Sequence, residues 1–330
     1  MRCNCVRWKN IGPVGEFDLI RKYFARRPVA GAELGIGDDC ALLGLRAGAG
    51  ASLAISTDML VAGRHFFADV LPRALGHKAI AVNLSDLAAM GARPRAFTLA
   101  LALPEIDEPW LDEFSQGLFA LADRHGCELI GGDTTQGPLN ICITVFGDCN
   151  ADTALRRDHA QPGDDVWVSG ELGGAHYSVR ERYAGRSLPP GHGATRRAEW
   201  PTPRVELGLA LRHLAKAAID ISDGLVGDLG HIADRSRAGI ELRWTTIPFD
   251  TALAGLGEDT ARMLALNGGD DYELAFCAAS ENRVAIESLS AGLELRLSRI
   301  GSVHAGSGVS VVDDRGARVN ADFRSFDHFA

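Results

Sequence analysis

The alternation of apolar and polar positions predicts strands and helices in turn along the first half of the chain. Residues 72–91 begin at a proline, are almost wholly apolar and end at a glycine, which favours a long buried helix. The apolar spacing of residues 109–125 predicts a second helix. Short apolar runs at 52–57, 95–103 and 140–147 predict strands. The first half should therefore form a sheet with helices packed on it.

A polar stretch at 150–165, which contains the turn sequence QPGDD, divides the chain. A new apolar strand is predicted at 166–170, and strands and helices alternate again beyond it. Residues 185–203 are rich in Pro, Gly and Ser and predict a mobile surface loop or a joint between helices. We therefore predict two domains, residues 1–149 and 150–330, each with its own apolar interior.

Composition and charge narrow the class of protein. The chain has 330 residues, 46% hydrophobic and 23% charged, as expected for a folded globular protein. Its 43 acidic residues outnumber 34 basic ones, and no basic block occurs, which argues against binding to nucleic acid or an anionic membrane. The longest apolar run, 96–103, is far shorter than the roughly 18 residues of a membrane span. With no apolar signal core at the N-terminus, we expect a cytoplasmic protein.

The seven cysteines are an odd number in a chain without a secretion signal, so reduced thiols are expected. Cys3 and Cys5 are close enough to bind a soft metal, but no second Cys or His pair follows at zinc spacing. A terminal extension is the favoured interpretation of this segment.

Acidic residues gather where the predicted apolar strands end or begin. A carboxylate at the edge of a sheet can converge with others on one cleft. The acids in such positions are Asp38, Asp39, Asp58, Asp133, Asp220, Asp223, Asp270 and Asp271.

Asp86 differs, because it falls within the apolar helix predicted at 72–91, three residues after Asn83 and on the same face. A carboxylate there costs several kcal/mol of desolvation unless a cation or hydrogen bonds compensate it. Lys78 lies eight residues earlier, about two turns away, so a pair between them cannot be assumed. Asp86 is either a capped or lysine-paired core acid or a metal ligand.

The acid-rich segments supply hard oxygen ligands, with hydroxyls at Ser56, Thr57 and Ser222, and almost no thiolate or imidazole. Such ligands suit Mg²⁺, which is typically completed by water and by substrate phosphates. The sequence has no phosphate-binding Gly-x-x-x-x-Gly-Lys loop, dinucleotide Gly-x-Gly-x-x-Gly or kinase His-Arg-Asp loop. Any phosphoryl transfer must use another scaffold.

Three further residues have two interpretations each. His65 lies near the acids and either contacts a substrate phosphate or is an ordinary surface or core histidine. Arg157 is suited to clamp a nucleotide phosphate, although its neighbour Arg156 has the same chemistry. Phe326, in the polar tail with Phe323, either anchors the tail or stacks on a flat ligand.

Taken together, the motifs resemble bacterial thiamine-monophosphate kinases, a family of the aminoimidazole ribonucleotide synthetase superfamily. The resemblance runs in order from about Gly15 to Ala330. It rests on the segments GIGDDCALL, AISTDMLVAGRHF, KAIAVNLSDLAAMGA, LIGGDTTQGPL, AIDISDGLVGDLGHI, GGDDYEL and FDHFA.

The resemblance implies a fold of α/β and α+β class, in which an N-terminal α/β domain forms a sheet or barrel in a homodimer and a C-terminal α+β domain completes the cleft. It also implies transfer of the γ-phosphoryl group of ATP to thiamine monophosphate, with several Mg²⁺ ions. No general base is required, since the attacking phosphate oxygen is largely ionised near pH 7.

Site residues follow position by position from the same resemblance. Asp58, Asp133 and Asp223 are expected to be central to catalysis. The metal-binding positions are Asp39, Ser56, Thr57, Asp58, Asp86, Asp133, Asp220 and Asp223. The ATP contacts are Gly132, Asp133, Arg157 and Ser222, and the substrate positions are His65, Asp270 and Phe326.

Two substitutions depart from the family pattern, since Asp270 stands in place of Glu and Phe326 in place of a frequent Tyr.

Within the superfamily, selenophosphate synthetases are expected to carry a reactive Cys in an N-terminal glycine-rich loop, and hydrogenase-maturation proteins end in a Cys; this chain has neither feature. A calcium-binding module is a rival of another class, but no loop of alternating acids closed by Glu is found.

Overall fold

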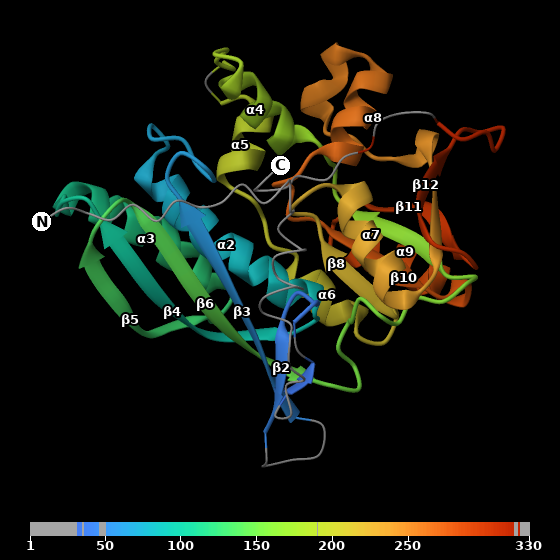
Figure 1. The fold of residues 1–330 in the computed structure, drawn as a ribbon, viewed down its shortest axis with the longest axis horizontal. Helices are drawn as coiled ribbons and strands as arrows, with labels where there is room; N and C mark the ends of the chain where they lie inside the picture. Colours follow the sequence, from blue (N-terminus) through green and yellow to red (C-terminus); the bar gives the residue numbers. More distant parts are fainter. Residues whose placement is uncertain (1–31, 35, 46–50, 190, 320–322, 324–330) are drawn as a thin grey trace, which may run out of the picture.

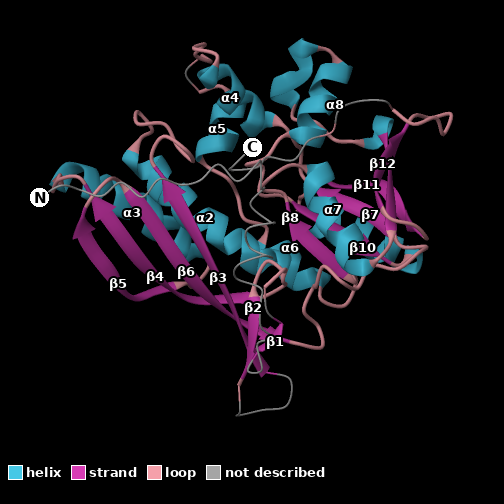
Figure 2. Ribbon diagram, viewed as in Figure 1, coloured by secondary structure: helices cyan, strands magenta, loops and turns pink. Residues whose placement is uncertain are grey.

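The structure is a computed structural model and describes residues 32–34, 36–45, 51–189, 191–319 and 323 (Figure 1). Within these residues two six-stranded sheets stand side by side, as Figure 2 shows. The first sheet has the order β1 (Ala32–Leu34), β2 (Ala41–Gly44), β3 (Ala51–Val61), β6 (Asn140–Asn150), β4 (Arg93–Leu103) and β5 (Glu128–Gln136). The second has the order β12 (Gly308–Val312), β9 (Gly239–Arg243), β11 (Leu297–His304), β7 (Asp165–Ser169), β10 (Leu274–Ala278) and β8 (Ala217–Asp220).

Both sheets are mixed, because most neighbouring strands are antiparallel whereas β4 with β5, and β9 with β12, run parallel. The α-helices cover them or connect the two halves. They are α2 (Pro72–Ala89), α3 (Glu108–Arg124), α4 (Gly174–Tyr183), α5 (Gly193–Glu199), α6 (Val205–Leu211), α7 (Leu225–Ser236), α8 (Glu258–Asn267) and α9 (Arg283–Gly292).

Helix α2 is the central element of the molecule. It starts at Pro72, whose ring suits the first turn of a helix, and almost all of its residues are buried. It packs on the first sheet and α3 on one side and contacts β8 and α6 on the other. The largest apolar cluster consequently includes Leu84 of α2 together with Trp167 and Phe276 of the second sheet. The expectation of a separate interior for each half was therefore wrong for this cluster, although a second cluster lies within the C-terminal half.

The strands and helices predicted between residues 52 and 147 are confirmed, but several extend further; a helix expected at 16–27 lies outside the described residues. Asp58 and Asp133 do not end their strands: β3 continues to Val61 and β5 to Gln136, because the residues beyond the acids still pair with β6 and β4. Asp220 does end β8.

Of the two alternatives for 185–203, a joint between helices agrees with the structure, because the segment connects α4 to α6; a loop alone was incomplete, because α5 forms inside it. Arg197 of this helix is held by buried acids, at 3.1 Å from Asp250 and 3.4 Å from Glu273. These long-range ion pairs hold a segment whose composition alone suggests a loop.

Among the described residues, five cysteines are free thiols and no helix combines the length and apolar character needed to cross a membrane. Cys3, Cys5 and Phe326 lie outside the described residues.

Candidate active site

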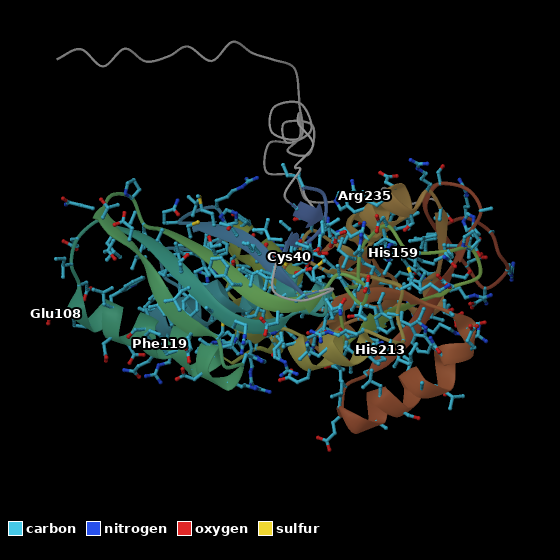
Figure 3. The ribbon with its side chains drawn as sticks, turned by 90° about the horizontal axis from the view of Figure 1, so that it is seen from below. Cys40, Glu108, Phe119, His159, His213 and Arg235 are labelled. Carbon is cyan, nitrogen blue, oxygen red and sulfur yellow. The ribbon has the colours of Figure 1, made fainter. Side chains whose placement is uncertain are left out.

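Three carboxylates meet at the junction of the two halves. Asp39 precedes β2, Asp86 lies on α2 and Asp220 ends β8, and one oxygen of each lies within 4.8 Å of the others. Figure 3 shows Cys40, the residue after Asp39, at this junction. Residues far apart in the sequence therefore build one acidic centre, hereafter the acid cluster (Asp39, Asp86, Asp220).

Hydroxyl groups hold Asp86 and Asp220, and the positive charge of Arg157 only partly offsets the raised pKa of Asp220. Ser56 of β3 donates a hydrogen bond to Asp86, and Ser85 donates one to Asp220 at 2.6 Å. Burial raises the pKa of Asp86 well above its usual range, and the nearby Asp58 and Asp220 charges raise it further. Burial and then Asp39 raise the pKa of Asp220 in the same way. Like charges held this close out of water call for a cation between them.

Asp39 has a protein cation, because Arg157 donates to both of its carboxylate oxygens at 3.0 and 2.6 Å. Asp38, in contrast, binds backbone N–H groups. Its oxygens accept the backbone N–H groups of Asp39 and Arg157, both at 3.1 Å. Burial and the Asp39 charge raise the pKa of Asp38 to about 7. These are the hydrogen bonds of a residue that shapes the turn rather than one that faces a ligand.

Strand β3 presents Ser56 and Thr57 to different neighbours. Ser56 contacts Asp86, and the charge of Asp58 acts on that same carboxylate. Thr57 is exposed, and its hydroxyl lies 2.9 Å from that of Thr144 on β6. Because successive side chains of a strand alternate between faces, Ser56 and Asp58 belong to the cluster side of the sheet and the Thr57 side chain to the opposite face.

The Ser222–Asp223 turn lies between β8 and α7. Asp228 of α7 accepts hydrogen bonds from the N–H groups of Asp223 and Gly224 at 3.2 and 3.0 Å, which fixes the turn. A Cβ at Gly269 would lie 2.1 Å from the Ser222 carbonyl oxygen, so this second loop approaches closely only because it has no side chain there. The two loops thus form one wall beside the acid cluster.

Asp270 follows Gly269 in the second loop, and its backbone N–H donates to the Ser222 carbonyl at 2.9 Å. Lys78 of α2 donates to Asp270 at 3.0 Å, and Tyr272 donates to its other oxygen at 3.1 Å. His65 accepts the Val61 N–H through Nδ1 at 2.9 Å and lines a pocket together with Lys78. The open question about Asp86 is thereby answered in part: Lys78 pairs with Asp270 instead.

Gly132 and Asp133 are not brought to the acid cluster of their own chain. Both are exposed on β5, the outer strand of the first sheet, whereas Asp58 lies on β3. Strands β6 and β4 stand between them, so β3 and β5 are three strand spacings, or about 14 Å, apart. A Cβ at Gly132 would lie 1.9 Å from the Leu99 carbonyl oxygen of β4, which explains the glycine.

Three contributors to the site were missed from the sequence: Ser85, Asp228 and Tyr272. Each lies in a motif already quoted, yet none stands out by residue type. Ser85 adjoins Asp86 on α2, and neighbours on a helix point about 100° apart, so only the packing of β8 beside α2 shows that Ser85 meets Asp220.

Comparison with known proteins agrees with this architecture. Residues 37–149 match the N-terminal domain of AIR synthase related proteins, and residues 161–314 match the C-terminal domain. The fold and the site thus define an AIR synthase related protein.

Relatives of known activity narrow this class. A thiamine-monophosphate kinase of Salmonella typhimurium is 45% identical over 323 residues, which cover 96% of this chain and 98% of the relative. The Escherichia coli K12 enzyme of the same name is 44% identical with the same coverage. The chain belongs to the thiamine-monophosphate kinase family.

Solved structures lead to the same result. The crystal structure of thiamine-monophosphate kinase from Stenotrophomonas maltophilia is 48% identical and superposes with a TM-score of 0.77, covering 89% of this chain and 94% of that one. A structure described as AaThiL complexed with AMPPCP and TMP is 29% identical with a TM-score of 0.84, covering 98% and 100%. The Escherichia coli hydrogenase maturation protein HypE, 22% identical with a TM-score of 0.68, shares the fold alone.

Proposed function

We propose that this chain transfers the γ-phosphoryl group of ATP to the phosphate of thiamine monophosphate, giving thiamine diphosphate and ADP. The observation that carries the proposal is the acid cluster at the junction of two AIR synthase related domains, in a chain 45% identical to a thiamine-monophosphate kinase over nearly its whole length. The complex of the AaThiL relative with an ATP analogue and TMP supports the choice of substrates. A cytoplasmic location, where ATP and Mg²⁺ are abundant, belongs to the same proposal.

Magnesium is the metal that the donor set fits. The cluster offers hard carboxylate oxygens, buried and mutually repelling, with a hydroxyl at Ser56 and the Asp58 charge nearby. When bound, Mg²⁺ neutralises the negative charge of the two phosphates that must approach each other. The residues proposed to hold it are Asp39, Ser56, Asp58, Asp86, Asp220 and Asp223, with Asp133 from a second copy; Thr57, predicted as a ligand, has its side chain on the opposite face of β3, against Thr144.

The other predicted residues are proposed to orient the reactants. Arg157 is half-buried, and its Nε and Nη2 groups already bind Asp39; we propose that its remaining guanidinium N–H groups bind a phosphate of ATP. Ser222 is proposed to bind ATP from the rigid wall described above, whereas His65 and Asp270 bind the acceptor from the pocket side. Since the acceptor phosphate is already ionised, these groups position and bind, and no side chain must remove a proton.

The position of Gly132 and Asp133 supports a homodimer. Every residue of β5 is exposed, including the apolar Leu129 and Ile130, and one edge of the strand has no neighbouring strand among the described residues. Such a strand is expected to be covered by a partner. We infer that a second copy packs there and that Asp133 of one chain serves the acid cluster of the other.

The decisive experiment is an assay of the purified chain with ATP, Mg²⁺ and thiamine monophosphate, with thiamine diphosphate separated by chromatography. Product should form only when all three are present and should disappear when EDTA removes the metal. Hydrolysis of ATP without phosphorylated thiamine would instead indicate another activity of the superfamily. Calcium binding without ATP binding, measured by calorimetry, would favour the calcium-binding module.

A further inference from the structure

The ion pair between Lys78 and Asp270 stands between the acid cluster and the pocket lined by His65. We propose that Lys78 is the residue that binds the phosphate of thiamine monophosphate at the point of transfer. This inference rests on the proposed function and adds a substrate-binding cation to it.

Lys78 is held in place by the buried helix at the centre of the fold. It lies in the middle of α2, is only 6% exposed, and its Nζ lies 3.0 Å from Asp270 Oδ2. Asp270 comes from the C-terminal half and has a left-handed backbone, with φ of 67°. The pair therefore bridges the two halves of the molecule at a fixed position, although 29% of the Asp270 side chain remains exposed.

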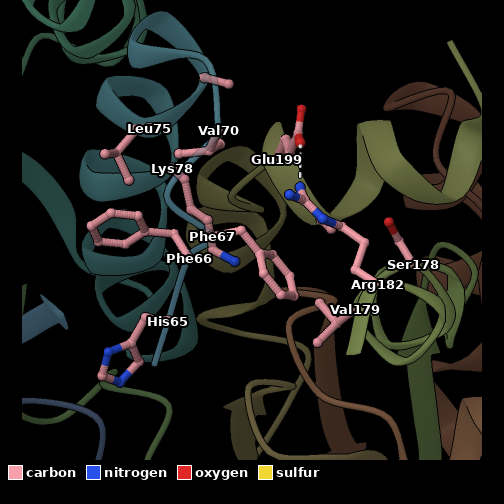
Figure 4. Close-up of a pocket in the computed structure, with 12 residues that line it drawn as sticks. His65, Phe66, Phe67, Val70, Leu75, Lys78, Ser178, Val179, Arg182 and Glu199 are labelled. Atoms are coloured by element: carbon pink, nitrogen blue, oxygen red, sulfur yellow. Dashed lines mark ion pairs between the residues drawn. The ribbon is translucent and has the colours of Figure 1, made fainter. Parts of the chain in front are cut away.

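On one side of the pair is the pocket of Figure 4. Its walls are largely apolar, with Phe66 and Phe67 from the segment after β3 and Ala198 from α5. The other cation in it, Arg182, is already occupied: its guanidinium lies 4.0 Å from the centre of the Phe67 ring and 3.7 Å from Glu199. An aromatic and aliphatic pocket of this kind suits a flat heteroaromatic ring.

On the other side of the pair is the acid cluster. Tyr272, which donates to Asp270, is buried, and burial raises the pKa of its hydroxyl; the charges of Asp270, Asp58 and Asp220 raise it further. The backbone N–H of Tyr272 donates to the carbonyl of Ile221 at 2.9 Å, and Ile221 directly follows Asp220 of the acid cluster. An acceptor with its ring in the pocket would point its phosphate past Lys78 toward these acids.

Charge complementarity supports the same assignment. Thiamine monophosphate carries a cationic thiazolium ring and an anionic phosphate, and the Lys78–Asp270 pair offers one charge of each sign. An ammonium group has three donors on a flexible stem, so Lys78 can turn from Asp270 to a phosphate oxygen without backbone movement. Asp270 then retains the Tyr272 hydrogen bond and faces the cationic ring.

The experiment compares two ligands that differ only by the phosphate. Calorimetric titrations of thiamine monophosphate and of thiamine, with Mg²⁺ and no nucleotide, are performed on the wild-type chain and on Lys78→Met. The variant should bind thiamine monophosphate about 10- to 100-fold more weakly, the range of a charge-assisted hydrogen bond, and thiamine within about twofold of wild type. Its kcat/KM for thiamine monophosphate should fall similarly while the KM for ATP stays within about twofold.

Arg73→Met is the matched control, because Arg73 lies on the same helix but is exposed and paired with Glu113; it should change neither affinity. Lys78→Arg should retain part of the preference for the phosphorylated ligand. If Lys78→Met fails to fold, Lys78→Gln, which keeps a donor toward Asp270, replaces it.

Equal weakening of both ligands would overturn the inference, because Lys78 would then only shape the pocket, and so would unchanged affinity for thiamine monophosphate. These results differ from failure of the proposed function, which would appear as absence of thiamine diphosphate with the wild-type chain itself.

Discussion

The two sheets end in edge strands of opposite character. Strand β8 closes the second sheet next to the acid cluster, and all four of its residues are buried because α2 packs beside it. Strand β5 closes the first sheet, and all nine of its residues are exposed. Among the described residues, the C-terminal half thus covers this edge within the chain, whereas no strand pairs with the outer edge of the N-terminal half. A proposed ATP and metal residue, Asp133, lies on this outer edge.

The largest effect is expected on the stability of the C-terminal half. Glu273 is 1% exposed, and Arg204 donates to it at 2.6 Å. Arg204→Met leaves this buried carboxylate without its main partner and should lower the free energy of unfolding by about 3–5 kcal/mol, measured by urea titration. The exposed Arg196→Met is the control and should cost less than about 0.5 kcal/mol. Similar losses in the two variants would contradict the assigned role of Glu273.

The next largest effect is expected on catalysis, from Asp133 on the exposed strand β5 and from Asp220 of the acid cluster. Asp133→Asn and Asp220→Asn should each lower kcat by about 100- to 1000-fold with the fold intact by circular dichroism, because each removes a carboxylate from the proposed metal site.

Co-expression of these two variants tests whether Asp133 of one chain serves the acid cluster of the other. In a dimer that shares its sites, a mixed pair has one site with both acids intact, so the mixture should recover about a quarter of wild-type activity. A mixture as inactive as its components would mean that Asp133 does not serve the partner's site.

A third prediction addresses the partner directly. Ile130 is 62% exposed on β5, and Ile130→Lys should convert the dimer to monomers in light scattering, because a charge would be buried in the interface. Val284→Lys, at a 73% exposed position on α9, is the matched control and should leave the mass unchanged. A monomeric wild-type chain would refute the proposed homodimer.

The smallest effect is the response of stability to pH and metal. The folded-state pKa values of Asp86 and Asp220 are raised, and that of Asp38 is about 7. An acid whose pKa is raised by folding contributes its stability below its unfolded value near 4, and this contribution is lost as the pH rises through the folded value. The metal-free protein should therefore lose stability between about pH 4 and 7.

Mg²⁺ should reverse this loss and raise the Tm more at pH 7.5 than at pH 5. At pH 7.5 and a Mg²⁺ concentration a hundredfold above Kd, the stabilisation should be about 3 kcal/mol. Differential scanning calorimetry measures both responses. The control variant Asp112→Asn, at an exposed position, should show the same rise in Tm with Mg²⁺ as wild type. Asp86→Asn should show a smaller rise. An equal effect of Mg²⁺ at both pH values would contradict the interpretation that Asp86 and Asp220 repel each other without a metal ion.

Local features of the sequence determined much of this protein. Apolar spacing predicted α2 and the strands of the first sheet, because helix and strand periodicities involve neighbouring residues. The ordered motifs were sufficient to identify the family. The abundance of hard oxygen donors favours Mg²⁺, which stays a prediction.

Tertiary structure alone decided which of these residues meet. Asp86 joins Asp39 and Asp220 because α2 lies between the two sheets, and Lys78 pairs with Asp270 across that same junction. Strand order placed Asp133 on the outer edge, away from Asp58. Periodicity shows which face of an element a residue occupies, but which element covers that face depends on pairing and packing between distant segments, which no local pattern records.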